Sequence, residues 1–347
     1  MKTELIKVDY SLNIESQLIE AANIIKRGGL VVFPTETVYG LGASALDGDA
    51  SKKIYAAKGR PSDNPLIIHI SSPEDAEKYC FTSEVYYKLA SRFMPGPLTI
   101  IMPRREIIPL DVTGGLDTVA VRCPQDSVAR ALISLSGVPI AAPSANISGK
   151  PSPTSASHVI SDLDGKVDMI IDGGSCEIGL ESTIVKIDGE KATLLRPGAI
   201  TPEMLLEVVN EISIDDGITK KSETNNAPLA PGMKYKHYAP RAQVWLLKGS
   251  NVKILNFLQK KLSENKNVGI LCFEEFKAKL NGKYIVDFGK QSDGEAHAKI
   301  LFSALRYFDT TEVNEIYATV TGLNGIDLAT YNRMLKASGY SILDVGE

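Results

Sequence analysis

The sequence predicts an α/β protein, and three observations lead to that prediction. Short apolar segments such as Leu30 to Phe33 alternate with amphipathic segments such as Ile14 to Lys26, and Gly or Pro residues separate them. Apolar residues make up 44% and charged residues 23% of the 347 residues, an ordinary composition for a globular protein with a sizeable core. Alternation of strands with helices is typical of the α/β class.

Residues 1–210 carry most of this alternation and form the first predicted domain. Besides the helix over 14–26, which Gly28-Gly29 ends, we expect a helix over 50–58 with Asp49 as its N-cap. Further helices are expected over 83–93, over 127–135 and from about residue 155. The expected strands cover residues 30–33, 66–70, 98–102, 118–122, 138–142, 169–171, 183–187 and 193–195.

A second, smaller α/β domain is predicted over residues 241–347. The composition shifts at about residue 211, and Ser213 to Ala227 is polar and weakly patterned, which is typical of a linker. We therefore predict that residues 211–240 connect the two domains. In the second domain we expect helices over 252–262 and 296–307, and strands over 244–247, 268–273, 284–286 and 316–320.

Charge and cysteine usage narrow the class of function. The net charge of −4 gives no global basic field that would recruit nucleic acid. The four cysteines lie far apart and the four histidines lack metal-ligand spacing, so we expect neither a disulfide framework nor a protein-bound metal. No signal-like or membrane-spanning apolar segment is visible. These features predict a soluble, cytoplasmic protein without membrane contact.

Two proline-punctuated segments carry the most informative side chains. The first is 57–66, which contains Lys58, Arg60 and Asn64, and the second is 142–146, which contains Ser144 and Asn146. Basic residues at a helix end are often only surface cations that complement the helix dipole. Here the prolines make the following turns stiff. We therefore predict that both segments form a cradle for a phosphate chain.

Other polar residues follow predicted strands. His69, Arg122 and Arg196 each lie near the end of a strand, and ligands in α/β proteins collect at such ends. If those strands are neighbours, the two arginines would join Lys58 and Arg60 around a polyanion. Neutralising such a charge is the main task of phosphoryl and nucleotidyl transfer.

Three other motifs leave alternatives open. Gly40-Leu41-Gly42 fits a dinucleotide-binding turn, although a lone match is weak and six residues separate it from the preceding strand. Ser182 has no histidine placed to activate it, which favours a binding hydroxyl. The cluster of residues 234–238, with His237 and Tyr238, is either an RNA-facing patch or a lid, and its flanking prolines favour the lid.

Taken together, these segments resemble the YrdC-type L-threonylcarbamoyladenylate synthases in their two-domain form. The resemblance covers essentially the whole chain and is weakest after residue 241. Its motifs occur in order along the sequence: Val32 to Leu41, Lys58-x-Arg60, Ser144-x-Asn146, Asp172-Gly173-Gly174, Leu195 to Gly198 and His237 to Pro240.

The resemblance implies a fold, a reaction and site residues. The fold would be a YrdC-like twisted, open mixed sheet with flanking helices, followed by a Rossmann-like α/β domain. The reaction would join L-threonine, bicarbonate or CO2, and ATP into threonylcarbamoyl-AMP and diphosphate. Magnesium would arrive with the ATP. Other proteins would then transfer the product to tRNA, to the adenosine beside the anticodon.

By similarity, the site residues fall into two sets. Lys58 and Arg60 would be catalytic and would bind ATP. The threonine or its carbamate would be bound by Thr35, His69, Thr118, Arg122, Ala142 and Ser182. The ATP would also be bound by Asn64, Ser144, Asn146, Ser152, Arg196, His237 and Tyr238, of which the last two would close the linker over the site.

Three other functions stay open from the sequence. The first domain could be an RNA-binding module, because members of the family are also described as offering a concave basic surface to double-stranded RNA. The second alternative is an NAD-type enzyme built on Gly40 and Gly42. The third concerns residues 241–347 alone, which could serve as a scaffold for partner proteins.

Overall fold

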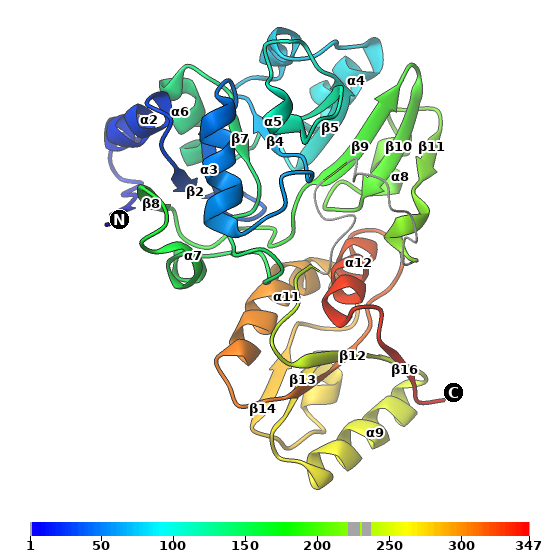
Figure 1. The fold of residues 1–347 in the computed structure, drawn as a ribbon. Coiled ribbons are helices and arrows are strands. Elements are labelled where there is room, and N and C mark those ends of the chain that lie inside the picture. The colour runs from blue at the N-terminus through cyan, green and yellow to red at the C-terminus, as the bar shows by residue number, and fades with distance from the viewer. Residues whose placement is uncertain (1, 221–229, 231–236, 347) are drawn as a thin grey trace. The chain divides into compact units, whose positions relative to one another are not determined.

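The computed structural model describes residues 2–220, 230 and 237–346, and these form two compact units (Figure 1). The first unit holds most of residues 2–220 and the second holds most of residues 237–346. Each unit combines a sheet with flanking helices, so the predicted α/β class is confirmed. Each is described by itself below.

The first unit is built on one mixed sheet. Within the described residues its eleven strands lie in the order β1-β8-β2-β3-β7-β4-β6-β5-β9-β10-β11. Parallel and antiparallel pairs occur together, for example β4 with β6 and β5 with β6. The strands are β1 (Glu4–Lys7), β2 (Val31–Phe33), β3 (Gly40–Ser44), β4 (Ile67–His69), β5 (Leu98–Pro103), β6 (Thr118–Arg122), β7 (Ile140–Ala142), β8 (Met169–Asp172), β9 (Thr183–Asp188), β10 (Lys191–Arg196) and β11 (Ile212–Ile214).

Helices cover this sheet and complete its core. Leu18 and Ile25 pack with Leu132 against Phe33 and Ile140, and all five are fully buried. Burying one such side chain stabilises the fold by about 1.5–3 kcal/mol. The helices are α1 (Ile14–Gln17), α2 (Ile19–Lys26), α3 (Gly48–Lys58), α4 (Glu84–Phe93), α5 (Leu110–Thr113), α6 (Ser127–Ser136), α7 (Ala156–Leu163) and α8 (Pro202–Leu206), with 3-10 turns η1 (Pro73–Lys78) and η2 (Asp216–Ile218).

The Gly40-Leu41-Gly42 segment is a strand and not a dinucleotide-binding turn. It forms the start of β3, which pairs antiparallel with β2. A Cβ on Gly42 would lie 2.7 Å from both Phe33 Cε1 and Ile140 Cγ2, so this glycine lets neighbouring side chains pack against the strand. The interpretation of these glycines as an NAD-binding motif is therefore wrong.

Two element boundaries differ from the sequence prediction. The helix expected over 14–26 is interrupted at Leu18, which separates α1 from α2. The sheet also extends past residue 210, because Ile212 and Ile214 pair parallel with Ala192 and Leu194 at its edge. Only three residues long and largely exposed, this edge strand has little apolar pattern that could identify it in the sequence.

Helix α3 begins two residues earlier than expected, at Gly48, and Asp47 caps it. The Asp47 side chain accepts hydrogen bonds from the backbone N–H groups of Asp49 (2.9 Å) and Ala50 (3.1 Å). We predict that Asp47→Ala lowers the free energy of unfolding by about 1 kcal/mol. Asp49→Ala should lower it far less, because that exposed carboxylate only pairs with exposed Lys52 and complements the helix dipole. Urea unfolding of both variants checks this, and equal losses would contradict it.

The second unit is a further α/β unit, as predicted, and its sheet is parallel in the order β14-β13-β15-β12-β16. If these five strands are numbered 1 to 5 along the chain, their order in the sheet is 3-2-4-1-5. The first five strands of the dinucleotide-binding sheet have the order 3-2-1-4-5, so strands 1 and 4 are exchanged here. Helix α12 and strand β16 were not predicted. The elements are β12 (Gln243–Lys248), α9 (Asn251–Glu264), β13 (Val268–Cys272), α10 (Glu274–Lys277), β14 (Tyr284–Asp287), α11 (Gly294–Asp309), β15 (Glu315–Thr319), α12 (Asp327–Ser338) and β16 (Ile342–Asp344).

Two further expectations concern cysteines and membranes. All four cysteines are buried free thiols, so none forms a disulfide. Within the described part of the chain, no helix is both long and apolar enough to cross a bilayer.

Candidate functional site

A row of three polar side chains crosses the middle of the first sheet. His69 of β4 is the register partner of Arg122 of β6, and Arg122 is the partner of Thr99 of β5. Directly opposite residues on neighbouring strands project from the same face of a sheet. All three are buried. His69 and Arg122, far apart in the sequence, are thus brought together as predicted from their strand-end positions.

The Arg122 guanidinium forms a buried ion pair with Glu36. Its Nη2 donates to Glu36 Oε1 at 2.7 Å, and the two side chains are 5% and 4% exposed. Glu36 lies in the loop between β2 and β3, where Ile178 N donates to its backbone carbonyl at 2.8 Å. Because a lone buried charge is costly, this contact holds both side chains in place.

Ser182 connects this row to Arg196. The hydroxyls of Ser182 and Thr99 lie 2.7 Å apart, and Arg196 Nη2 donates to Ser182 Oγ at 3.1 Å. Arg196 Nε also donates to the Ser182 carbonyl at 3.0 Å. Ser182 thus links Arg196 of β10 to Thr99, which is the register partner of Arg122 on β6.

Ser152 joins the same region through a second buried carboxylate. Its Oγ donates to Glu181 Oε1 at 2.5 Å, and Glu181 directly precedes Ser182. Both side chains are buried. Ser152 comes from the hydroxyl-rich loop after β7, so this contact ties that loop to the start of β9.

Lys58 ties together the two proline-punctuated segments. Its Nζ donates to the backbone carbonyls of Ser144 and Asn146, each at 2.5 Å. The Ser144 hydroxyl donates to Asn146 Oδ1, also at 2.5 Å. With 2% exposure, Lys58 is not the surface cation that a helix end usually carries. The structure therefore brings together three of the five residues that the sequence singled out in these segments.

Arg60 organises the loop that follows helix α3. Gly59 ends the helix in the left-handed conformation (φ 61°), and Arg60 Nη2 then donates to the carbonyls of Asn64 (3.3 Å) and Pro65 (3.1 Å). Among the described residues, Asn64 Oδ1 has no hydrogen-bond partner although it is buried. An oriented, buried amide of this kind is suited to contact a ligand.

Three other predicted residues lie in different elements of the first unit. Thr35 is buried, and its hydroxyl donates to Val38 O at 2.6 Å within the β2–β3 loop. Ala142 ends β7 opposite Ile67. Thr118 starts β6, four residues before Arg122, which separates the two by roughly 13 Å along the strand. The strand therefore places Thr118 level with the residues just before β4, away from the His69–Arg122 row.

His237 and Tyr238 belong to the second unit. Their ring centroids lie 5.5 Å apart, and Tyr238 packs on Phe302 of α11 with ring centroids 5.0 Å apart. Tyr238 adopts a left-handed backbone (φ 63°), which is uncommon for a bulky residue. The closure of these residues over ATP stays a prediction. Residues 234–236 of the same cluster lie outside the described part of the chain.

Sequence reasoning gave no role to four residues of this region. Glu36, Thr99 and Glu181 are buried beside predicted site residues, and Asp126 caps helix α6 close to Arg122. Glu36 and Glu181 stand next to the predicted residues Thr35 and Ser182, which was the available signal. Thr99 offered none, because a threonine inside a strand is ordinary.

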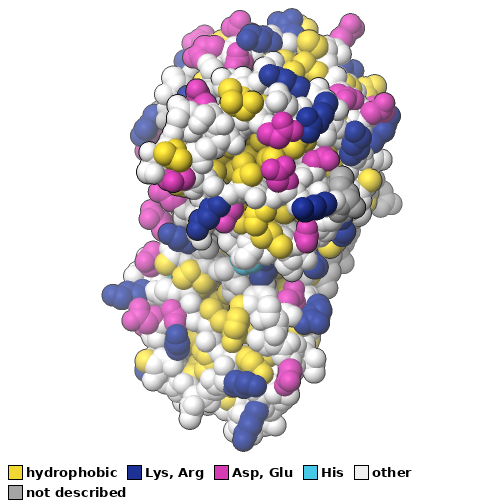
Figure 2. All heavy atoms as spheres, turned by 90° about the vertical axis from the view of Figure 1, so that its left-hand side faces the viewer, with side chains coloured by type: hydrophobic (Ala, Val, Ile, Leu, Met, Phe, Trp, Pro, Cys, Tyr) yellow, Lys and Arg dark blue, Asp and Glu magenta, His cyan; other side chains and the backbone are white. Residues whose placement is uncertain are grey.

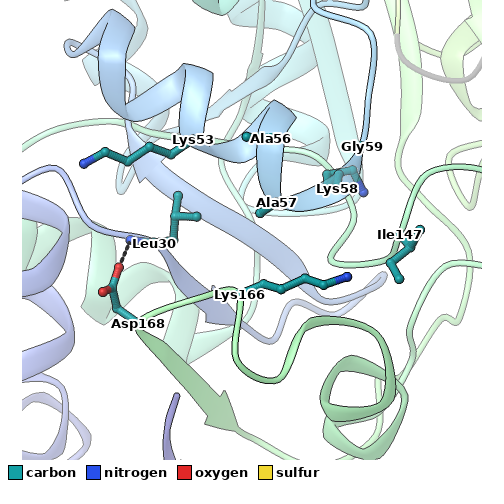
Figure 3. Close-up of a pocket in the computed structure, with 9 residues that line it drawn as sticks. All are labelled: Leu30, Lys53, Ala56, Ala57, Lys58, Gly59, Ile147, Lys166 and Asp168. Atoms are coloured by element: carbon teal, nitrogen blue, oxygen red, sulfur yellow. Dashed lines mark hydrogen bonds between the residues drawn. The ribbon is translucent and has the colours of Figure 1, made fainter. Parts of the chain in front are cut away.

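A separate pocket of about 740 Å³ opens beside helix α3 (Figure 3). Of the predicted site residues only Lys58 lines it. Lys53 Nζ donates to Gly28 O at 2.7 Å, and Asp168 accepts from Leu30 N at 2.7 Å, so both of these charged groups brace the backbone. We assign no part of the predicted chemistry to this pocket.

Burial shifts the pKa values of two groups near Arg122 in opposite directions. Desolvation and the charge of Arg122 lower the pKa of His69 to about 3. Its Nδ1 lies 3.3 Å from Ile140 O, which suits a neutral ring that donates from this nitrogen. Desolvation raises the pKa of Asp126 to about 6, and the charge of Glu36 contributes to this rise.

The shift at His69 predicts a pH dependence of stability. Unfolded His69 takes up a proton as the pH falls below about 6.5, whereas the folded side chain stays neutral until about pH 3. The free energy of unfolding therefore falls with decreasing pH across that window. From pH 7 to pH 5 we expect the wild type to lose about 2 kcal/mol more than His69→Asn does. Urea unfolding at both pH values measures this, and identical losses would contradict it.

No group of three or more His, Cys, Asp and Glu side chains in the described residues is placed to hold a metal ion. The side chains grouped with Lys58 in the two proline-punctuated segments are amides, a hydroxyl and the guanidinium of Arg60. A dedicated metal cage at this place would need carboxylates, which this set of residues lacks.

Two family models match the chain. Residues 23–198 match the Sua5/YciO/YrdC model, which is described as "Telomere recombination". Residues 200–339 match the model described as "Threonylcarbamoyl-AMP synthase, C-terminal domain". The fold and the site thus define a protein of the Sua5/YciO/YrdC class that carries the Sua5 C-terminal domain.

Relatives cover the whole chain. A threonylcarbamoyl-AMP synthase of Pyrococcus abyssi is 48% identical over 332 residues, which cover 94% of this chain and 95% of the relative. One of Bacillus subtilis is 44% identical and covers 99% of this chain and 100% of its own length. The crystal structure of P. abyssi Sua5 complexed with L-threonine superimposes with a TM-score of 0.91 at 46% identity, covering 99% of each chain. The chain belongs to the threonylcarbamoyl-AMP synthase family.

Proposed function

We propose that this enzyme is a nucleotidyltransferase that makes threonylcarbamoyl-AMP from L-threonine, bicarbonate or CO2, and ATP, with release of diphosphate. Membership of the threonylcarbamoyl-AMP synthase family indicates the product. The archaeal relative that was crystallised with L-threonine supports threonine as a substrate. The observation that carries the proposal is a continuous set of polar contacts: Arg122 lies opposite Thr99, whose hydroxyl contacts Ser182, and Arg196 donates to Ser182. Lys58 separately holds Ser144 and Asn146 together.

The threonine would lie at the His69–Arg122 row. The planar guanidinium of Arg122 is suited to a carboxylate, because it pairs with both oxygens at once. Thr35, Ala142 and Ser182 would contact the rest of the amino acid and its carbamate. His69 stays neutral near pH 7, so it would act as a hydrogen-bonding partner and not as a cation.

The nucleotide would lie along the cradle of Lys58, Arg60, Asn64, Ser144 and Asn146. The threonine ammonium first loses a proton to solvent, and the free amine then adds to CO2 and releases a second proton to give a carbamate. A carbamate oxygen then attacks the α-phosphorus, the bond to the β-phosphate breaks, and diphosphate leaves. The protein positions the reactants and stabilises the negative charge, which is the main catalytic task in such transfers.

Other groups would complete the site. Ser152 and Arg196 would bind ATP from the side of Glu181 and Ser182. Thr118 would contact the substrates from the start of β6. His237 and Tyr238 would close over the site and exclude water from the hydrolysable carbamate. Magnesium would arrive with the ATP, because the cradle holds amides, hydroxyls and cations and would bind the metal only through the phosphates.

We propose that the product is used in the cytoplasm by other proteins that modify tRNA. Direct tRNA contact is the weaker possibility. Figure 2 shows Lys and Arg side chains interspersed with Asp and Glu on the face that it presents, and not gathered into one basic field. A surface of mixed charge binds nucleic acid weakly.

Diphosphate release by the full chain tests this function. The assay contains ATP, Mg²⁺ and bicarbonate, with threonine, serine or no amino acid. We expect release to require an amino acid and to favour threonine over serine by about 10–200-fold, the usual value of one methyl group in a binding pocket. Release that is independent of threonine and bicarbonate would refute the proposal. Salt-dependent tRNA binding without such release would favour the RNA-binding module.

A further inference from the structure

The buried ion pair between Glu36 and Arg122 leaves one atom of each partner unused. Glu36 Oε1 accepts from Arg122 Nη2, whereas Glu36 Oε2 and Arg122 Nε have no hydrogen-bond partner among the described residues. Both side chains are more than nine-tenths buried. Buried polar atoms are normally paired, so one unpaired acceptor beside one unpaired donor indicates a missing ligand.

The two unpaired atoms differ in the ligand group that they suit. The Arg122 nitrogen is a cationic donor, which a carboxylate would satisfy. The Glu36 oxygen is an anionic acceptor, which an ammonium or amine would satisfy. An α-amino acid carries these two groups on one carbon atom. The Glu36–Arg122 pair is therefore complementary to an amino acid as a whole and not only to its carboxylate.

The surroundings hold the Glu36 carboxylate ready for such a contact. Its backbone carbonyl accepts from Ile178 N at 2.8 Å, and the neighbouring Thr35 hydroxyl donates to Val38 O at 2.6 Å. The β2–β3 loop that carries Glu36 is thus fixed at both of these residues. A group that is already oriented loses little conformational entropy when a ligand binds.

The local charge also favours an ammonium. Two carboxyl groups, of Glu36 and Asp126, lie near the single guanidinium of Arg122, and the neighbouring His69 is neutral near pH 7. The ammonium of an amino acid would add a positive charge beside the Glu36 carboxylate, and its carboxylate would lie next to the Arg122 guanidinium.

Resting on the proposed function, we propose that Glu36 binds the α-amino group of the amino-acid substrate through Oε2, while Arg122 binds its carboxylate. Glu36 therefore selects for an amino acid, in addition to holding Arg122 in place. It also fixes the nitrogen that captures CO2 once the ammonium has lost a proton to solvent. A 2-hydroxy acid of the same shape would satisfy Arg122 but would lack the cation that Glu36 prefers.

Calorimetric titration of the full chain without ATP tests this assignment. The two ligands are L-threonine and its 2-hydroxy analogue, in which a hydroxyl replaces the amine. The wild type should bind threonine at least about tenfold more tightly than the analogue, because a hydrogen bond between two charged groups is the stronger one. In Glu36→Gln this preference should fall to about threefold or less, because the amide still accepts from Arg122 but carries no charge.

A purely supporting role of Glu36 predicts a different result. If Glu36 only orients Arg122, Glu36→Gln weakens both ligands equally and the preference stays unchanged, which would overturn the proposal. A wild type that binds both ligands equally would also overturn it. Glu84→Gln, which removes an exposed carboxylate paired with Lys88, is the matched control and should keep the wild-type preference.

Two further measurements keep the outcomes separate. If Glu36→Gln does not fold, as judged by thermal unfolding, Glu36→Asp replaces it. That side chain keeps the charge but withdraws it from the ligand, so the preference for threonine should still fall at least about threefold. Threonine-dependent diphosphate release by the wild type is measured in parallel. Its absence would refute the proposed function, whereas an unchanged ligand preference refutes only the assignment of Glu36.

Discussion

Replacing Lys58 by alanine is expected to lower threonine-dependent release of diphosphate from ATP by at least about 100-fold. The Nζ atom is buried and donates to the carbonyls of Ser144 and Asn146 at 2.5 Å. Its removal takes a positive charge from the proposed phosphate cradle. It also leaves two backbone carbonyls without their donor, which loosens the loop that presents Ser144 and Asn146.

The measurement is the initial rate of diphosphate release at saturating threonine and ATP. Lys52→Ala is the matched control, because Lys52 lies on the same helix, is 59% exposed and pairs only with the surface residues Asp49 and Asp111. We expect that variant to keep the wild-type rate within about twofold, since exposed ion pairs contribute little. A Lys58→Ala protein that folds and retains more than about a third of the wild-type rate would remove Lys58 from the catalytic machinery.

Much of the first unit follows from local sequence patterns. The strand over 118–122 and the helix starting at residue 127 are found where expected, because each combines an apolar pattern with a clear boundary residue. Asp126 caps that helix, and Gly137 ends it in the left-handed conformation. Such signals act over a few neighbouring residues, so a single sequence contains them.

Two of the strands that were missed, β3 and β11, depend on their partners in the sheet. Strand β3 begins with Gly-Leu-Gly, which has no strand propensity of its own, and it forms because its glycines let Phe33 and Ile140 pack closely. Edge strand β11 exists through pairing with β10. Strands β2 and β10 themselves were predicted, but their pairing with β3 and β11 could not be, because strand pairing is decided by the whole sheet.

The same distinction holds for the site. Lys58, Ser144 and Asn146 could be predicted together because proline and residue type mark both segments. Glu36 could not, since its importance arises from a contact with Arg122, 86 positions further along the chain. The role of Thr118 stays a prediction, because the sequence does not say which end of its strand faces the ligand.

Replacing Arg122 by lysine is expected to lower kcat/KM for threonine by about 30- to 1,000-fold, equivalent to about 2–4 kcal/mol. The effect should lie mainly in KM for threonine, with KM for ATP changed less than about threefold. Lysine keeps a positive charge near Glu36, but its ammonium cannot present the two parallel donors that a guanidinium offers to a carboxylate. Arg27→Lys, at a position 61% exposed, is the control and should have no effect.

Arg122→Ala should be the more damaging change, and for two separable reasons. It removes the proposed carboxylate partner, and it leaves the buried Glu36 carboxylate without its cation, which costs about 3–5 kcal/mol of stability. Adding Glu36→Gln to Arg122→Ala should restore most of that stability, because the buried charge is then gone, but it should restore none of the threonine binding. Recovery of both would show that Arg122 acts only on the fold, and wild-type threonine affinity in Arg122→Lys would place the carboxylate elsewhere.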